Sequence, residues 1–154
     1  MMVQHHNPCF VIADGGHLRL VKPAPDNALH TIEAIDAASV HKKTHDLVSD
    51  RAGRSHESVG VVRHAIAPRN DPHELEKTRF AHFIGEKLNE QNTAGGFEEL
   101  ILVAPAQILA EIRDKLDTVT EAKVAGTLAK DLTKVPDHEL HPHLKQWVRP
   151  TQRQ

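Results

Sequence analysis

The sequence predicts a single α/β domain with a mixed β-sheet and the element order β-β-β-α-β-α-β-α. Three observations predict this fold class. Short apolar runs separated by turn residues occupy the first 36 positions, a capped stretch with helical periodicity begins at residue 71, and a continuous apolar run covers 99–104. The 154 residues, 39% of them hydrophobic, suit one domain over residues 1–154, with a core at about 9–147 and frayed termini.

The N-terminal third carries the pattern of a strand meander. The apolar run CFVIA (9–13) is followed by Asp-Gly-Gly and an alternating segment. We expect a tight turn between two strands, because Gly15 and Gly16 accept positive φ. Pro23 ends the second strand, since proline cannot donate to a ladder. Residues 28–36 predict a weaker third strand.

Residues from about 37 to 70 show little periodicity and predict a long loop. Between residues 40 and 70 the chain has six Lys or Arg and three acids, a net charge of +3, whereas the rest of the chain carries −5. The whole chain has a net charge of −2, so the positive charge is concentrated on this basic loop.

A long helix is predicted from residue 71, where Asp71 suits the N-cap and Pro72 suits the first turn. One stripe of this helix contains Phe80, Phe83, Ile84 and Leu88, and the opposite face contains Arg79, His82, Glu86 and Glu90. Gly95 and Gly96 fit a helix stop.

The C-terminal half alternates strands and helices. The run ELILVA (99–104) predicts a strand covered on both faces, Pro105 opens a helix, and residues 123–129 predict a last strand. A short helix follows Pro136, with Pro142 bending or splitting it. The apolar positions are Ile108, Leu109, Ile112 and Leu116 in the first helix, and Leu140, Leu144 and Trp147 in the second.

Composition excludes several classes of protein. No apolar run approaches the length of a membrane span, and the N-terminus lacks the pattern of a signal peptide. The single cysteine, Cys9, fits a reducing compartment, so we expect a cytoplasmic protein. Four Phe, one Trp and no Tyr disfavour a base-stacking platform. Phosphate-binding glycine motifs are absent, and no cofactor is expected.

The loop segment SDRAGRSHES (49–58) holds the main candidate binding residues. Arg51 and Arg54, with Ser55 beside them, can present guanidinium groups to phosphate or carboxylate. In the alternative interpretation, these arginines form ion pairs with neighbouring acids and only hold the loop.

Ser55, His56 and Glu57 raise the possibility of a hydrolase. Catalytic triads depend on spatial geometry, and adjacent side chains in an extended segment point in opposite directions. The three residues therefore do not form a triad together, and His56 or Glu57 is a catalytic candidate only as a single general base.

Lys130 and Asp131 follow the last predicted strand, at the edge where open α/β sheets bind ligands. They are candidate binding residues, although Asp131 also suits a cap and Lys130 a surface charge. Asp14 is interpreted as a turn residue.

Histidine is the most unusual feature of the composition, with 13 residues. His41 and His45 have i,i+4 spacing, and His138, His141 and His143 are loosely spaced. Neither group identifies the four ligands of a closed zinc site, so no metal site is predicted.

Five segments in order resemble a bacterial family, the host attachment proteins ("proteins required for attachment to host cells"). They are VIADGGHLRLV, THDLVSDRAGRSHES, DPHELEKTRFAHFIGEKLNE, FEELILVAPAQILAEIRDKL and AKDLTKVPDHEL. The likeness spans roughly residues 9–147. It implies a non-enzymatic interaction protein that acts in adhesion. Because no secretion signal is recognised, this requires either an indirect role or export by an unrecognised route.

The family is similar in turn to the central domain of archaeal and eukaryotic peptide-chain release factors, which implies a ribonuclease-H-like arrangement. In that domain the loop between the third strand and the long helix carries Gly-Gly-Gln, which promotes peptidyl-tRNA hydrolysis. Here SDRAGRSHES takes this place and lacks Gly-Gly-Gln. The resemblance therefore implies the fold and the position of the loop, without the hydrolytic activity. The ribosome, RNA or an unidentified protein remain alternative partners.

Overall fold

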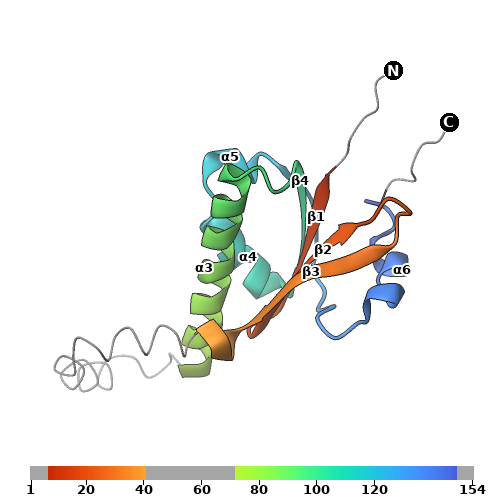
Figure 1. Cartoon of the computed structure of the whole chain (residues 1–154). Coiled ribbons are helices and arrows are strands. Elements are labelled where there is room, and N and C mark those ends of the chain that lie inside the picture. Colours follow the sequence, from red (N-terminus) through yellow and green to blue (C-terminus); the bar gives the residue numbers. More distant parts are fainter. Residues whose placement is uncertain (1–6, 41–71, 149–154) are drawn as a thin grey trace, which may run out of the picture.

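The computed structural model describes residues 7–40 and 72–148, which form a five-stranded sheet between two layers of helical segments (Figure 1). The strands are β1 (Pro8–Ala13), β2 (His17–Pro23), β3 (Leu29–Asp36), β4 (Glu99–Val103) and β5 (Val124–Leu128). The helical segments are α3 (Pro72–Thr93), α4 (Ala106–Asp114), α5 (Thr118–Glu121), η1 (Asp137–Glu139) and α6 (His141–Leu144). None of these described helices is long and apolar enough to cross a membrane.

The sheet has the strand order β3-β2-β1-β4-β5. β1 pairs antiparallel with β2, and β2 pairs antiparallel with β3. β4 lies parallel to β1, and β5 lies parallel to β4. The predicted α/β class with a mixed sheet is therefore confirmed, and the carboxyl ends of β1, β4 and β5 meet at one edge.

The central strands bury side chains on both faces of the sheet. In β1, Cys9 and Val11 face one apolar cluster, whereas Phe10 and Ile12 face the other. β4 alternates in the same way: Leu100 and Leu102 face the first cluster, and Ile101 and Val103 face the second. These strands therefore read as continuous apolar runs, as expected for strands covered by helices on both sides.

The first covering layer consists of α3, α4 and α5 (Figure 1). The predicted stripe of α3 is confirmed: Phe80, Ile84 and Leu88 are buried, and Phe83 is half-buried with its ring 5.9 Å from that of Phe80. Gly85 is also buried, and a Cβ there would lie 2.7 Å from the backbone oxygen of Ile112 in α4. The absence of a side chain thus lets α3 and α4 approach closely.

The second layer consists of the C-terminal segment, which packs on the opposite face of the sheet (Figure 1). Its buried residues are Leu132, Leu140, Leu144 and Val148. The predicted helix is split as expected into η1 and α6, and Pro142 lies in the first turn of α6. Trp147 lies beyond the end of α6, where it packs beside Gly126 of β5, so its predicted place in the helix was wrong.

Arg19 in β2 attaches this C-terminal segment to the sheet. Its Nη1 donates to the backbone oxygens of Leu132 (3.0 Å), Thr133 (3.2 Å) and Val135 (2.6 Å). Its Nη2 lies 2.6 Å from Oδ1 of Asp137. Because the Arg19 side chain is only 13% exposed, this is a largely desolvated set of charge-assisted hydrogen bonds.

The turn between β1 and β2 does not use positive φ at Gly15 or Gly16, which corrects the expectation from sequence. Among the described glycines, only Gly95 has positive φ, at 77°, where it ends α3 as predicted. The turn is instead closed by Asp14, whose carboxylate accepts from the amides of the two residues after Gly15. This is the aspartate turn motif, which needs no left-handed residue.

Two helical segments are additional to the predicted order, and a third is a separate part of a predicted helix. Residues 37–40 are helical, with Asp36 accepting from the Ser39 amide (2.9 Å), so the predicted loop does not begin at residue 37. α5 begins at the cap Asp117, which accepts from the Thr120 amide (2.8 Å). The segment η1 is the first part of the split C-terminal helix. Such short pieces lack enough apolar repeats to reveal helical periodicity.

Candidate functional site

A cleft of about 470 Å³ opens at the sheet edge where β1, β4 and β5 end. Its walls come from the β1–β2 turn, the first turns of α3, the start of α4 and the segment after β5. The lining residues are Asp14, Gly15, Gly16, His17, Glu74, Lys77, Thr78, Pro105, Gln107, Ile108, Glu111 and Asp131. This is the edge at which open α/β sheets bind ligands.

Asp14 is the most extensively bonded side chain of the cleft. Its Oδ1 accepts from the amides of Gly16 and His17, both at 2.8 Å, and lies 3.0 Å from Nδ1 of His17. Its Oδ2 accepts from the Thr133 hydroxyl at 3.1 Å. Partial burial acts to raise the pKa of Asp14, but the bonds from Gly16, His17 and Thr133 outweigh it and hold the pKa below its usual range.

Asp131 lies in the cleft wall, and Thr133 connects it to Asp14. Oδ1 of Asp131 accepts from the Thr133 amide (2.9 Å) and lies 2.6 Å from the Thr133 hydroxyl. A hydroxyl has one proton, so Thr133 donates to one of the two carboxylates at a time. Lys130 is exposed and is not part of the lining, so the predicted pair is separated: Asp131 contributes to the cleft and Lys130 does not.

The cleft is negatively charged. Among the described residues that line it, four carboxylates, from Asp14, Glu74, Glu111 and Asp131, stand against one ammonium group, that of Lys77. Lys77 lies 3.5 Å from Glu74, and its aliphatic stem covers Gly15, where a Cβ would come within 2.5 Å of Lys77 Cγ. The cleft therefore favours cations and hydrogen-bond donors over phosphate.

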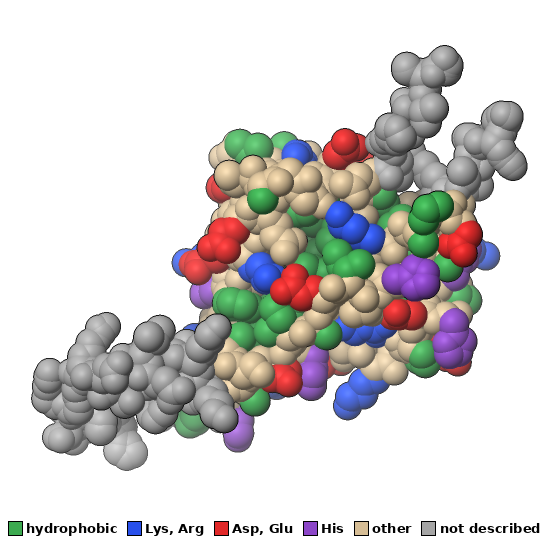
Figure 2. Space-filling view, viewed as in Figure 1, with side chains coloured by type: hydrophobic (Ala, Val, Ile, Leu, Met, Phe, Trp, Pro, Cys, Tyr) green, Lys and Arg blue, Asp and Glu red, His purple; other side chains and the backbone are tan. Residues whose placement is uncertain are grey.

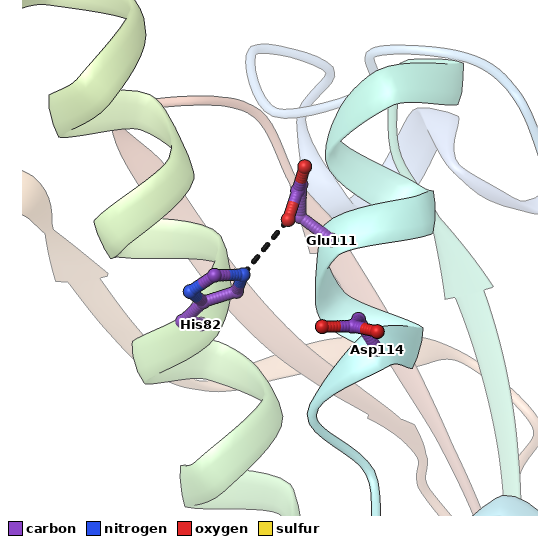
Figure 3. A group of neighbouring side chains, drawn as sticks. All are labelled: His82, Glu111 and Asp114. Atoms are coloured by element: carbon purple, nitrogen blue, oxygen red, sulfur yellow. Dashed lines mark hydrogen bonds and ion pairs between the residues drawn. The ribbon is translucent and has the colours of Figure 1, made fainter.

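At the α4 side of the cleft, three potential metal ligands lie together between α3 and α4 (Figure 3). His82 comes from α3, and Glu111 and Asp114 come from α4. Nε2 of His82 lies 2.8 Å from Oε1 of Glu111. His82 was predicted on the outward face of α3, which was wrong because that part of α3 faces α4; its side chain is 29% exposed.

The loop residues predicted from sequence lie outside the described residues. They are Arg51, Arg54 and Ser55 as binding residues, and His56 and Glu57 as catalytic candidates; all five remain predictions. Of the histidines considered for metal binding, His41 and His45 also lie outside the described residues. His138, His141 and His143 are exposed around η1 and α6.

Glu111, His82 and Thr133 were missed by the sequence analysis. Glu111 and Asp114 have the i,i+3 spacing that places two carboxylates on one helix face, which was a usable signal. The approach of His82 and the bridging position of Thr133 depend on packing between distant segments and had no signal in the sequence.

Residues 9–144 match the model of a protein family described as "Protein required for attachment to host cells". The match begins in β1 and ends with α6, so it includes both helical layers, the sheet and the cleft. Among curated proteins, none matches the sequence. Since the matched region is most of the 154 residues, the chain belongs to the family of proteins required for attachment to host cells.

Proposed function

We propose that this protein supports attachment to host cells as a non-enzymatic interaction protein, with an indirect role exerted from the cytoplasm. The family match over residues 9–144 carries the proposal, because it includes every strand of the sheet and the whole cleft. A cytoplasmic location is consistent with the single buried cysteine, Cys9, whose pKa is raised to about 12 by burial. At that pKa the thiol is inert.

The bonding of the cleft carboxylates supports a binding role over catalysis. A general base accepts a proton from its substrate and needs a pKa near the working pH. Both oxygens of Asp14 already accept hydrogen bonds within the protein, and its pKa is lowered. One oxygen of Asp131 closes the turn to Thr133. These carboxylates are therefore engaged in holding the cleft, with a negative surface left for a partner.

A partner that enters this cleft presents a positive group or hydrogen-bond donors. The carboxylate of Glu74 at the start of α3 and that of Asp131 after β5 line different walls of the cleft, so both contribute to its negative charge. Asp131→Asn combined with Glu74→Gln removes two charges while keeping side-chain size. We expect this variant to fold normally and to lose partner binding.

Adhesion to host cells, measured in a deletion strain, tests the proposal. Complementation with the wild-type gene restores adhesion, whereas the double variant restores it poorly. Glu139→Gln is the matched control, because Glu139 is exposed on η1, away from the cleft. Unchanged adhesion after deletion of the gene contradicts the attachment role.

Protease treatment of intact cells separates the indirect from the direct role. An indirect role predicts that the protein survives treatment that removes surface proteins, and that added purified protein does not compete for adhesion. Digestion of the protein on intact cells, together with competition, would show that it contacts the host directly.

A ribosome- or RNA-associated role is the second candidate. The meander β1–β2–β3 followed by α3 and the parallel strands β4 and β5 supports the ribonuclease-H-like arrangement of release-factor central domains. The basic segment 41–71 lies between β3 and α3, where those domains carry Gly-Gly-Gln. Figure 2 shows basic and acidic side chains interspersed on one face of the body, whereas residues 40–70 carry a net charge of +3 in the sequence.

Cosedimentation with ribosomes at low salt tests this candidate. Contacts from the six basic loop residues to phosphates predict a slope of log affinity against log salt of roughly −4. Arg51→Ala with Arg54→Ala weakens cosedimentation, whereas Arg113→Ala with Lys115→Ala, the same charge change on α4, leaves it unchanged. Equal loss in both double variants, or no cosedimentation of the wild type, contradicts a specific role of the loop.

A further inference from the structure

His82, Glu111 and Asp114 form a compact group of one imidazole and two carboxylates. One ligand atom from each lies within 4.8 Å of the others. Glu111 and Asp114 are three residues apart on α4, so their carboxylates share a helix face, and His82 approaches from α3. In Figure 3 the three side chains face one another between the two helices.

We propose that these three residues bind a divalent first-row transition-metal ion, such as zinc or cobalt. Imidazole nitrogen with carboxylate oxygen is a ligand set that such ions accept. Two carboxylates beside a neutral imidazole carry a charge of −2, which a divalent cation neutralises. The interhelical contact of His82 with Glu111 uses only one carboxylate, and within the described residues the carboxylate of Asp114 makes no hydrogen bond or ion pair.

The observed distances require only small movements of side chains. Around a tetrahedral ion with bonds of about 2.1 Å, ligand atoms lie about 3.4 Å apart. The 2.8 Å contact of His82 with Glu111 therefore lengthens slightly, and the widest separation, at most 4.8 Å, shortens by no more than about 1.4 Å. His82 and Glu111 are 29% and 33% exposed, and Asp114 is exposed, so rotation of their side chains meets little packing resistance.

Three protein ligands leave at least one coordination position for water or an added ligand, which is the arrangement of an open metal site. Glu111 belongs also to the cleft wall. The ion would therefore lie at the edge of the cleft and offer a positive centre next to a surface that is otherwise negative.

Titration of the untagged, metal-free full-length chain with Co²⁺ tests the proposal, since bound Co²⁺ absorbs visible light according to its coordination. We expect one Co²⁺ per chain, an absorption band typical of four or five coordination, and loss of the band on addition of Zn²⁺. Asp114→Asn and Glu111→Gln each weaken binding by at least ~10-fold. This is the lower end of the loss of metal affinity found when a residue that hydrogen-bonds to a metal ligand is changed. Asp114→Asn alters an exposed side chain and leaves the fold intact, so a loss of binding in it is not due to unfolding.

The matched control removes a different His–carboxylate pair. Nε2 of His138 lies 3.4 Å from Oε2 of Glu139, and both side chains are largely exposed. His138→Ala combined with Glu139→Gln leaves Co²⁺ affinity unchanged if the site is the one proposed. The proposal is overturned if the wild type shows no saturable binding below millimolar Co²⁺, or if Asp114→Asn and Glu111→Gln bind as the wild type does. In either case His82 and Glu111 form an interhelical ion pair only.

Discussion

Asp14 shows how one residue joins two distant parts of the chain. Its carboxylate closes the turn after β1 and also accepts from Thr133, which follows β5. Its hydrogen bonds stabilise the charged form and lower its pKa. The stabilisation is present above the ordinary aspartate pKa of about 3.9 and is lost as the pH falls through the lower folded-state pKa.

We therefore predict that Asp14→Asn makes the free energy of unfolding depend less steeply on pH in the acid range. At neutral pH the variant loses about 1 kcal/mol, because asparagine keeps part of the turn. Below about pH 4 its free energy of unfolding falls less steeply than that of the wild type, since the charge that is titrated has been removed. Urea denaturation at a series of pH values measures this. If the free energy of unfolding depended on pH in the same way in the two proteins, the lowered pKa of Asp14 would be contradicted.

Arg19 is predicted to contribute more to stability than any exposed ion pair in the described structure. Arg19→Met leaves Asp137 and three backbone oxygens without their charged donor, which costs about 2–3 kcal/mol. The control is Arg113→Met, which breaks the Arg113–Glu121 pair; both of these side chains are about 40% exposed, and its loss costs less than about 1 kcal/mol. Equal midpoints of urea denaturation in the two variants would contradict this difference.

At the scale of elements, the contact between α3 and α4 depends on Gly85. Alanine is the better helix former by about 1 kcal/mol, so substitution in an exposed helix would stabilise. Here the added Cβ would lie 2.7 Å from the Ile112 backbone oxygen and must separate the helices. Overpacking of this kind costs about 1–3 kcal/mol.

We predict that Gly85→Ala is destabilised by up to about 2 kcal/mol in urea denaturation, because an overpacking cost of about 1–3 kcal/mol exceeds the gain of about 1 kcal/mol in helix propensity. Glu86→Ala, at the exposed neighbouring position, changes stability by less than about 0.5 kcal/mol. Stabilisation by Gly85→Ala would mean that the two helices are not in close contact.

At the scale of the whole molecule, the two helical layers share one sheet. β1 supplies Val11 to the α3–α4 cluster and Phe10 to the C-terminal cluster. Neither layer can therefore unfold without exposing apolar side chains of the same strands. This arrangement predicts a single cooperative transition.

Trp147, the only tryptophan, reports on the C-terminal layer, whereas far-UV circular dichroism is dominated by α3 and α4. We predict coincident urea transitions by the two probes. Leu144→Ala, in the buried part of α6, costs about 2–5 kcal/mol and shifts both transitions together. Fluorescence that changes at lower urea than the dichroism would show that the C-terminal layer unfolds separately.

The sequence by itself determined the α/β class, the strand positions and the apolar stripe of α3, because period-2 runs, helical periodicity and caps are local signals. It also placed Asp131 at the end of the sheet where the cleft opens, since Asp131 closely follows a strand. The short helix α5 was missed, because four residues carry too little periodicity. The turn was placed correctly and Asp14 was identified as its turn residue, but the positive φ expected at Gly15 and Gly16 was wrong.

Only the tertiary structure decided which side chains meet. Thr133 lies between Asp14 and Asp131, His82 contacts Glu111, and Arg19 contacts Asp137 across 118 positions of sequence. These contacts depend on the parallel pairing of β1, β4 and β5 and on the close approach allowed by Gly85. Sequence patterns record which face of an element is apolar, whereas polar contacts between distant segments follow from the packing of those faces.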